Sequence, residues 1–127
     1  MQHFLWRCST GYMPCKEALL KRKIVNEAGC FRCWQAVESP LHATWTCVCS
    51  GAVMEKASFY SKLASGQYTS FTQLMEVALQ KLTVDEVKLL VILLWINWNE
   101  RNAVFHGGSV TAADVLLMVL LLCGLPS

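Results

Sequence analysis

Four residues in the first half of the chain have the types and the spacing of a metal site. They are Cys30, Cys33, His42 and Cys47, in the pattern Cys-x2-Cys-x8-His-x4-Cys. Two thiolates two residues apart can bind one ion from a tight turn, and a later His and Cys can complete a tetrahedron around it. Zn²⁺ suits this ligand set because it is borderline soft and has no ligand-field preference. A Cys₃His set has no open position, so it predicts one structural Zn²⁺ rather than a catalytic metal.

A competing interpretation is that these are ordinary buried cysteines and an unrelated histidine, because free Cys is among the most buried residue types. The occurrence of four potential ligands within 18 residues favours the metal site. Cys49 lies two residues beyond Cys47 and could replace it as the last ligand. The remaining thiols lack metal-type spacing and are predicted to be small core residues: Cys8, Cys15 and Cys123.

Charge is unevenly distributed along the chain. Residues 1–34 carry six basic and two acidic side chains, a balance of +4, whereas the remainder has a balance of −2. This asymmetry favours a polyanionic partner near the metal turn, although a solvated helix face would give the same pattern. The candidate contacts are basic and aromatic side chains of this region: Lys16, Lys21, Arg22, Lys23, Arg32 and Trp34.

Four of these candidates have structural alternatives. The run from Lys21 to Lys23 also suits the last turn of a helix, where cations complement the helix dipole. The ring of Trp34 could stack on a base, or it could form a hydrophobic lid over the metal.

Length and composition predict one compact intracellular domain. The chain has 127 residues, of which 54% are hydrophobic, enough to form a core. Seven cysteines without a basic-then-apolar leader after Met1 predict a reducing compartment, with nucleus and cytoplasm not distinguished. The longest apolar stretches, 87–96 and 115–122, are shorter than the roughly 18–20 residues of a membrane span, so no membrane is expected.

Helical periodicity and capping signals predict an all-α fold with a zinc-clamped turn near the N-terminus. A helix over 3–10 should end at Gly11, and one over 16–24 should turn Leu19, Leu20 and Ile24 inward. Ser39 and Pro40 should open a short helix that carries His42 and delivers Cys47. A further helix is expected over 51–63. Four tryptophans fall at core-facing positions: Trp6, Trp45, Trp95 and Trp98.

Three capping pairs predict the helices of the second half. Ser70 with Gln73, Thr83 with Glu86, and Thr111 with Asp114 each precede an apolar periodic segment. The predicted organisation is therefore a zinc-binding domain over 1–63, followed over 64–127 by an apolar helical extension that packs on it.

Several segments together resemble a known family. The segments 3–7, 14–25, 30–33, 37–43 and 45–47 (HFLWR, PCKEALLKRKIV, CFRC, VESPLHA and WTC) are similar to the zinc-binding domain of reverse transcriptases in LINE-type (non-LTR) retrotransposons, particularly those of plants. Weaker similarity at 94–105 (LWINWNERNAVF) matches the linker helix that precedes ribonuclease H in such elements. The resemblance covers about 100 residues and implies a chain that lacks the upstream start of the domain.

The resemblance assigns residues as well as a fold. It places Cys30, Cys33, His42 and Cys47 at the family's four ligand positions, and Glu38 at a frequent acidic position ahead of the His. The sequence departs from the family after the second Cys, where Gly is common because it adopts a positive φ easily. Here that position is Trp34.

The expected function is a non-catalytic module that helps to hold RNA or an RNA–DNA template. The chain has no Tyr-x-Asp-Asp polymerase signature, and its nine acidic residues do not suggest the clustered carboxylates of two-metal chemistry. An alternative is a protein-interaction domain that self-associates through its apolar C-terminal helices. Another is a decayed retroelement fragment without selected activity.

Overall fold

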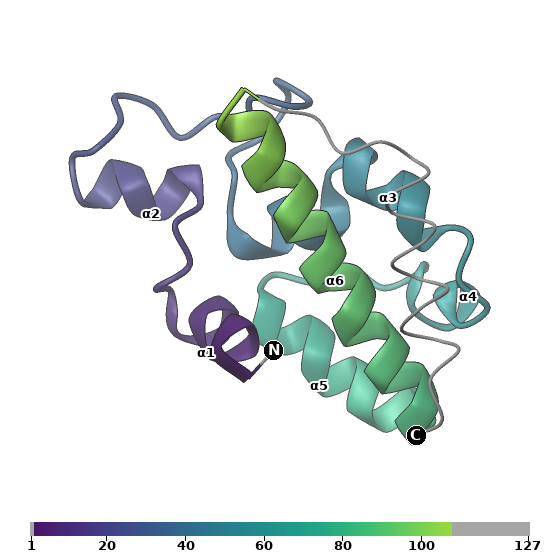
Figure 1. Ribbon diagram of the computed structural model, residues 1–127. Coiled ribbons are helices and arrows are strands. Elements are labelled where there is room, and N and C mark those ends of the chain that lie inside the picture. The colour runs from purple at the N-terminus through teal and green to yellow at the C-terminus, as the bar shows by residue number, and fades with distance from the viewer. Residues whose placement is uncertain (1, 108–127) are drawn as a thin grey trace.

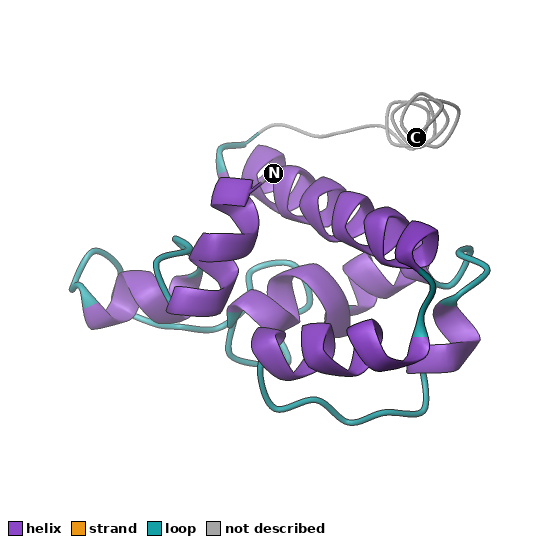
Figure 2. Cartoon of the chain, turned by 90° about the horizontal axis from the view of Figure 1, so that it is seen from below, coloured by secondary structure: helices purple, strands orange, loops and turns teal. Residues whose placement is uncertain are grey.

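The computed structural model describes residues 2–107, and this part of the chain consists of helices and loops (Figure 1, Figure 2). In these residues the only strand-like pairing is an isolated bridge between Gly29 and Val37. None of the described helices is both long and apolar enough to cross a bilayer. The predicted all-α fold is confirmed for this range. The elements are α1 (Gln2–Thr10), α2 (Lys16–Lys21), η1 (His42–Thr46), α3 (Val48–Met54), α4 (Tyr60–Leu63), α5 (Phe71–Lys81) and α6 (Val84–Phe105).

Helix α6 forms the centre of the structure, while α2 lies at its margin (Figure 1). Helices η1, α3 and α5 all pack against α6, and α1 packs against α5. One hydrophobic core extends from Phe4 in α1 to Trp98 in α6, so side chains from both sides of residue 63 share it. The C-terminal half of α6 also buries two polar side chains, Asn97 and Arg101. These two residues face the segment that contains the four candidate ligands.

The cap signals at the starts of α5 and α6 are confirmed. Thr83 Oγ1 accepts from the backbone N–H of Glu86 at 3.2 Å, and Glu86 Oε1 accepts from the backbone N–H of Thr83 at 2.9 Å, which completes a capping box. Ser70 Oγ caps α5 by accepting from Gln73 N–H at 3.1 Å. The third cap, the helix predicted after it and Cys123 lie outside the described residues.

Two helix boundaries differ from the prediction. The segment 51–63 is split, because α3 ends at Met54 and α4 begins at Tyr60. Met54 and Phe59 are both fully buried, whereas in one continuous α-helix residues five apart point about 140° away from each other. The predicted helix over 16–24 ends at Lys21, and Leu20 and Ile24 are exposed rather than inward.

The tryptophans divide between core and surface. Trp45 and Trp98 are buried as predicted, and Trp95 packs against the core while partly exposed. The prediction was wrong for Trp6, whose side chain is 56% exposed. On α1 the residues that face the core are instead Phe4 and Cys8, four residues apart on the same helix face.

Candidate metal centre

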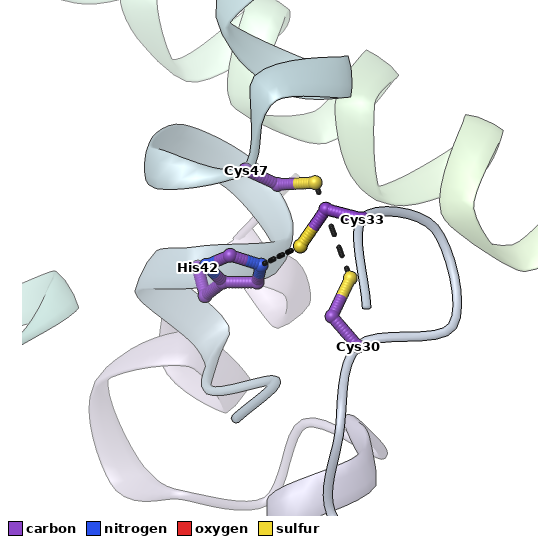
Figure 3. Close-up of side chains that lie close together, drawn as sticks. All are labelled: Cys30, Cys33, His42 and Cys47. Atoms are coloured by element: carbon purple, nitrogen blue, oxygen red, sulfur yellow. Dashed lines mark hydrogen bonds between the residues drawn. The ribbon is translucent and has the colours of Figure 1, made fainter. Parts of the chain in front are cut away.

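The structure brings Cys30, Cys33, His42 and Cys47 together, with one ligand atom of each residue within 4.8 Å of the others (Figure 3). The Sγ atoms of Cys30 and Cys47 are 4.0 Å apart, and Cys33 Sγ is 3.3 Å from His42 Nε2. A tetrahedral ion with Zn–S bonds of about 2.3 Å requires ligand atoms roughly 3.8 Å apart. The cluster therefore has the size and the donor set to hold a metal ion.

The first two thiols are positioned by a tight turn closed by backbone hydrogen bonds. The N–H of Cys30 donates to Ala36 O at 2.8 Å, and the N–H of Trp34 donates to Cys30 O at 2.9 Å. Trp34 adopts a φ of +59°. The turn thus takes the left-handed conformation for which glycine is suited, with a tryptophan at that position.

A π-helical turn positions the other two ligands. Ser39 Oγ accepts from His42 N–H at 3.0 Å, so the predicted cap is present, but the turn from His42 to Thr46 is wider than an α-helix. The N–H of Cys47 donates to His42 O at 2.9 Å, an i→i+5 bond. Residues five apart diverge by about 140° in an α-helix. The wider turn instead stacks them, so that His42 and Cys47 face the same point.

The carbonyl groups that this turn leaves free are bound by side chains. Ala43 O accepts from Arg32 Nη2 and from Ser50 Oγ, each at 2.7 Å. Thr44 O accepts from Asn97 Nδ2 of α6 at 2.9 Å. Buried carbonyl groups at a helix end need such partners, and these contacts fix the turn against both α3 and α6.

The orientation of His42 suits metal binding through Nε2. Its Nδ1 lies 3.1 Å from Thr46 Oγ1, which fixes the ring and leaves Nε2 facing the sulfurs. Burial, with a smaller contribution from the charge of Arg32, lowers the pKa of His42 below its ordinary value. The imidazole is therefore neutral at pH 7, the form that coordinates a metal.

The thiols of Cys33 and Cys47 differ in acidity. Burial raises the pKa of Cys47 to about 12, against the opposing effects of the Cys49 backbone N–H and of Arg32. Burial also opposes ionisation of Cys33, but hydrogen bonds from the backbone of Gln35 and from the neighbouring thiols outweigh it, and its pKa is lowered. Without a metal, Cys47 carries its proton at neutral pH, so metal binding must release that proton.

A buried ion pair anchors the segment between Cys33 and His42. Glu38 is 0% exposed and Arg101 of α6 is 2% exposed. Arg101 Nη2 donates to Glu38 Oε1 at 2.7 Å, and Arg101 Nε donates to Glu38 Oε2 at 3.0 Å. The guanidinium also lies within 5.1 Å of three aromatic ring centres, those of Phe31, Trp98 and Phe105.

The six nucleic-acid candidates do not form one surface. Lys16 is buried and its ammonium pairs with Glu27, while Arg32 turns inward to the carbonyl group of Ala43. The other candidates, Lys21, Arg22, Lys23 and Trp34, are exposed. Cys49 is exposed and is not part of the four-residue cluster, whereas Cys8 and Cys15 are buried as predicted.

Sequence reasoning missed the residues that support the ligands. The ring of His42 is held by Thr46, and the π-helical turn by Ser50 and Asn97. The segment before that turn is held by Arg101. Only the four-residue spacing of His42 and Thr46 gave a local signal. The partners on α6 lie more than 50 residues from their acceptors and share no motif with them.

No protein-family profile, curated protein or solved structure matches the chain.

We expect Arg101→Met to lower the free energy of unfolding by about 3–5 kcal/mol, because it leaves the buried Glu38 carboxylate without its partner. The double variant Glu38→Gln, Arg101→Met should recover part of this loss. Denaturant unfolding of the wild type, both single variants and the double variant measures the coupling. Additive effects would show that the pair does not act as a unit.

Trp34→Gly should raise the free energy of unfolding by about 1 kcal/mol, because glycine adopts a positive φ without strain and the ring of Trp34 is 75% exposed. The matched control is Gln35→Gly at the adjacent exposed position. Its backbone has no positive φ, so glycine should cost about 0.5–1 kcal/mol there. Thermal unfolding of the metal-loaded proteins compares the two. A loss of stability in Trp34→Gly would mean that the ring packs in solution.

Proposed function

We propose that this chain is a non-catalytic zinc-binding module, of the type found in reverse transcriptases of LINE-type retrotransposons, that helps to hold RNA or an RNA–DNA template. The observation that carries the metal assignment is the convergence of three thiols and one imidazole within 4.8 Å. The retroelement assignment rests on the sequence resemblance. The nucleic-acid assignment rests on that resemblance and on the exposed cations of the first third of the chain.

Zinc is the metal that this donor set favours. Three thiolates and a neutral imidazole fill a tetrahedron, which is the usual coordination of structural Zn²⁺. Three thiolates and one divalent ion leave a net negative charge, and the buried guanidinium of Arg32 can offset it. Its Nε and Nη1 atoms find no hydrogen-bond partner among the described residues. The positive charge of Arg32 already favours ionisation of Cys47, and it would stabilise the negative charge of the metal-bound thiolates in the same way.

The metal would stabilise the fold and would not activate water. With four protein ligands bound, no coordination position remains for an activated water. The ion would join the turn at Cys30 and Cys33 to the π-helical turn at His42 and Cys47. Metal binding of this kind contributes directly to folding free energy.

The nucleic-acid role is supported by cations that are not used inside the fold. Lys21, Arg22 and Lys23 are exposed at the end of α2. Lys21 is partly offset by Glu17, whose carboxylate is 3.8 Å away. Phosphate contacts from such side chains give affinity without sequence preference. The contacts therefore fit a module that holds a template whatever its sequence.

Protein purified without chelator should contain one equivalent of zinc, and Cys30→Ser should contain almost none, because Cys30 supplies a buried ligand. Cys49→Ser is the matched control and should keep its zinc, since Cys49 lies outside the cluster. Elemental mass spectrometry gives the stoichiometry. Zinc that is lost equally from both variants, or absent from the wild type, would contradict the assignment.

The same proteins allow a test of pH dependence. The pKa of Cys47 lies near 12 in the metal-free protein. Protons therefore compete with the metal at this thiol, and apparent zinc affinity should fall as pH falls from 8 to 6. Competition with a chromogenic chelator measures the affinity. A constant affinity over this range would indicate ligands other than thiols.

Zinc-loaded protein should bind single-stranded RNA more weakly as salt rises. If three cations contact phosphates, raising the salt from 50 to 200 mM should weaken binding by about tenfold to twentyfold. Replacing Lys21, Arg22 and Lys23 by Gln should largely remove that dependence. The control replaces three exposed cations elsewhere, Lys56, Lys81 and Lys88, by Gln. Fluorescence anisotropy measures both. Undetectable binding by the wild type, or equal effects in both triple variants, would contradict a defined surface.

A further inference from the structure

An exposed aromatic stack lies at the junction of α1 and α2, and none of its residues belongs to the candidate metal cluster. The rings of Trp6 and Tyr12 have centroids 5.3 Å apart and planes that differ by 5°. The guanidinium carbon of Arg22 lies 5.6 Å from the centre of the Tyr12 ring. Trp6 is 56% exposed and Tyr12 is 57% exposed. Large rings are thus held parallel while much of their surface remains in water.

The backbone around the stack is well anchored. Gly11, with a φ of +80°, ends α1 and turns the chain back. The N–H of Met13 then donates to Arg7 O at 3.2 Å. Met13 and Cys15 are each only 1% exposed, so the chain that follows Tyr12 is fixed in the core. The stack is therefore presented by ordered backbone, and its exposure does not result from a loose terminus.

We infer that Trp6, Tyr12 and Arg22 form a shelf on which an unpaired nucleobase stacks, with Lys23 and Arg22 contacting the adjoining phosphates. This inference rests on the proposed nucleic-acid function and names the surface that performs it. Exposed aromatic rings beside cations are a common means by which proteins bind single-stranded nucleic acid. A base stacks on a ring face at little cost in sequence specificity, because every base has a π face.

The charges beside the stack indicate which kind of partner it binds. The exposed charge of Lys21 has a structural explanation, because Lys21 is the last residue of α2, where a cation complements the helix dipole, and it pairs with Glu17. Arg22 is the C-cap residue of α2, and its guanidinium lies over the ring of Tyr12. Lys23 follows in a left-handed backbone conformation, with a φ of +60°, and is exposed. Arg22 and Lys23 form no ion pair among the described residues. Exposed rings beside such cations suit a partner that carries both negative charges and aromatic bases.

The experiment compares two exposed tryptophans in the full zinc-loaded chain. Anisotropy with fluorescein-labelled oligo(U) and oligo(dT) should show that Trp6→Ala weakens binding by about tenfold, the loss of one base stack. Trp34→Ala removes a ring that is more exposed, at 75% against 56% for Trp6, and lies outside the stack, so it should change binding less than about twofold. Trp6→Phe, which keeps a ring, should recover most of the affinity. A blunt duplex should bind about tenfold more weakly than the single strand, because its bases are already stacked.

The outcomes separate this inference from the proposed function. If the wild type binds neither oligonucleotide, both fail. If the wild type binds and Trp6→Ala binds equally well, or if only Trp34→Ala loses affinity, the shelf is wrong while nucleic-acid binding stands. Zinc content and circular dichroism identify a Trp6→Ala protein that has not folded, in which case Arg22→Gln, with an expected loss of about fivefold, decides. Light scattering that shows a wild-type dimer converted to monomer by Trp6→Ala would mean that a second copy occupies the stack.

Discussion

The carboxylate of Glu38 holds three parts of the molecule at one buried point. It accepts hydrogen bonds from the Arg101 guanidinium of α6 and from the backbone N–H of Lys16, the first residue of α2. The main chain of Glu38 adds two more contacts, because its N–H donates to Ala28 O and its carbonyl group accepts from Glu17 N–H. Glu38 therefore connects the marginal helix α2, the segment that leads into the turn at Cys30 and Cys33, and the central helix α6. A negative charge at the start of α2 also complements its dipole.

A buried ion pair is not in itself a strong source of stability, because removing two charges from water offsets most of their attraction. Its value here is positional. Glu38 precedes Ser39 and Pro40, which open the turn carrying His42, and Asn97 holds that turn one helical turn away from Arg101 on the same face of α6. Two polar contacts to one helix thus fix the position of the turn that carries His42. The four candidate ligands lie within 4.8 Å of one another while α6 holds this turn in place.

The parts of the fold that could be predicted from sequence are those encoded within a few residues. The caps at Thr83 and Ser70, and the ligand spacing from Cys30 to Cys47, each depend on neighbours along the chain. The pairing of Glu38 with Arg101 could not be predicted, because 63 residues separate them and the sequence around each predicts only an exposed charged side chain. The π-helical turn was also hidden. Nothing in the residues 42–46 distinguishes it from an α-helix except the need to align two ligands five residues apart.

The inward turn of Arg32 shows that a cluster of basic residues in the sequence need not form a basic surface. Composition identified a basic first third, but the fold uses Lys16 and Arg32 internally and leaves the cations at the end of α2 in solvent. In the proposed function, the metal turn would therefore contribute to nucleic-acid binding indirectly. Because Glu38 follows the metal turn and binds the first N–H groups of α2, an ion that orders this turn also fixes the helix that carries Arg22. The metal and the aromatic stack would then be separate in space and coupled through one carboxylate.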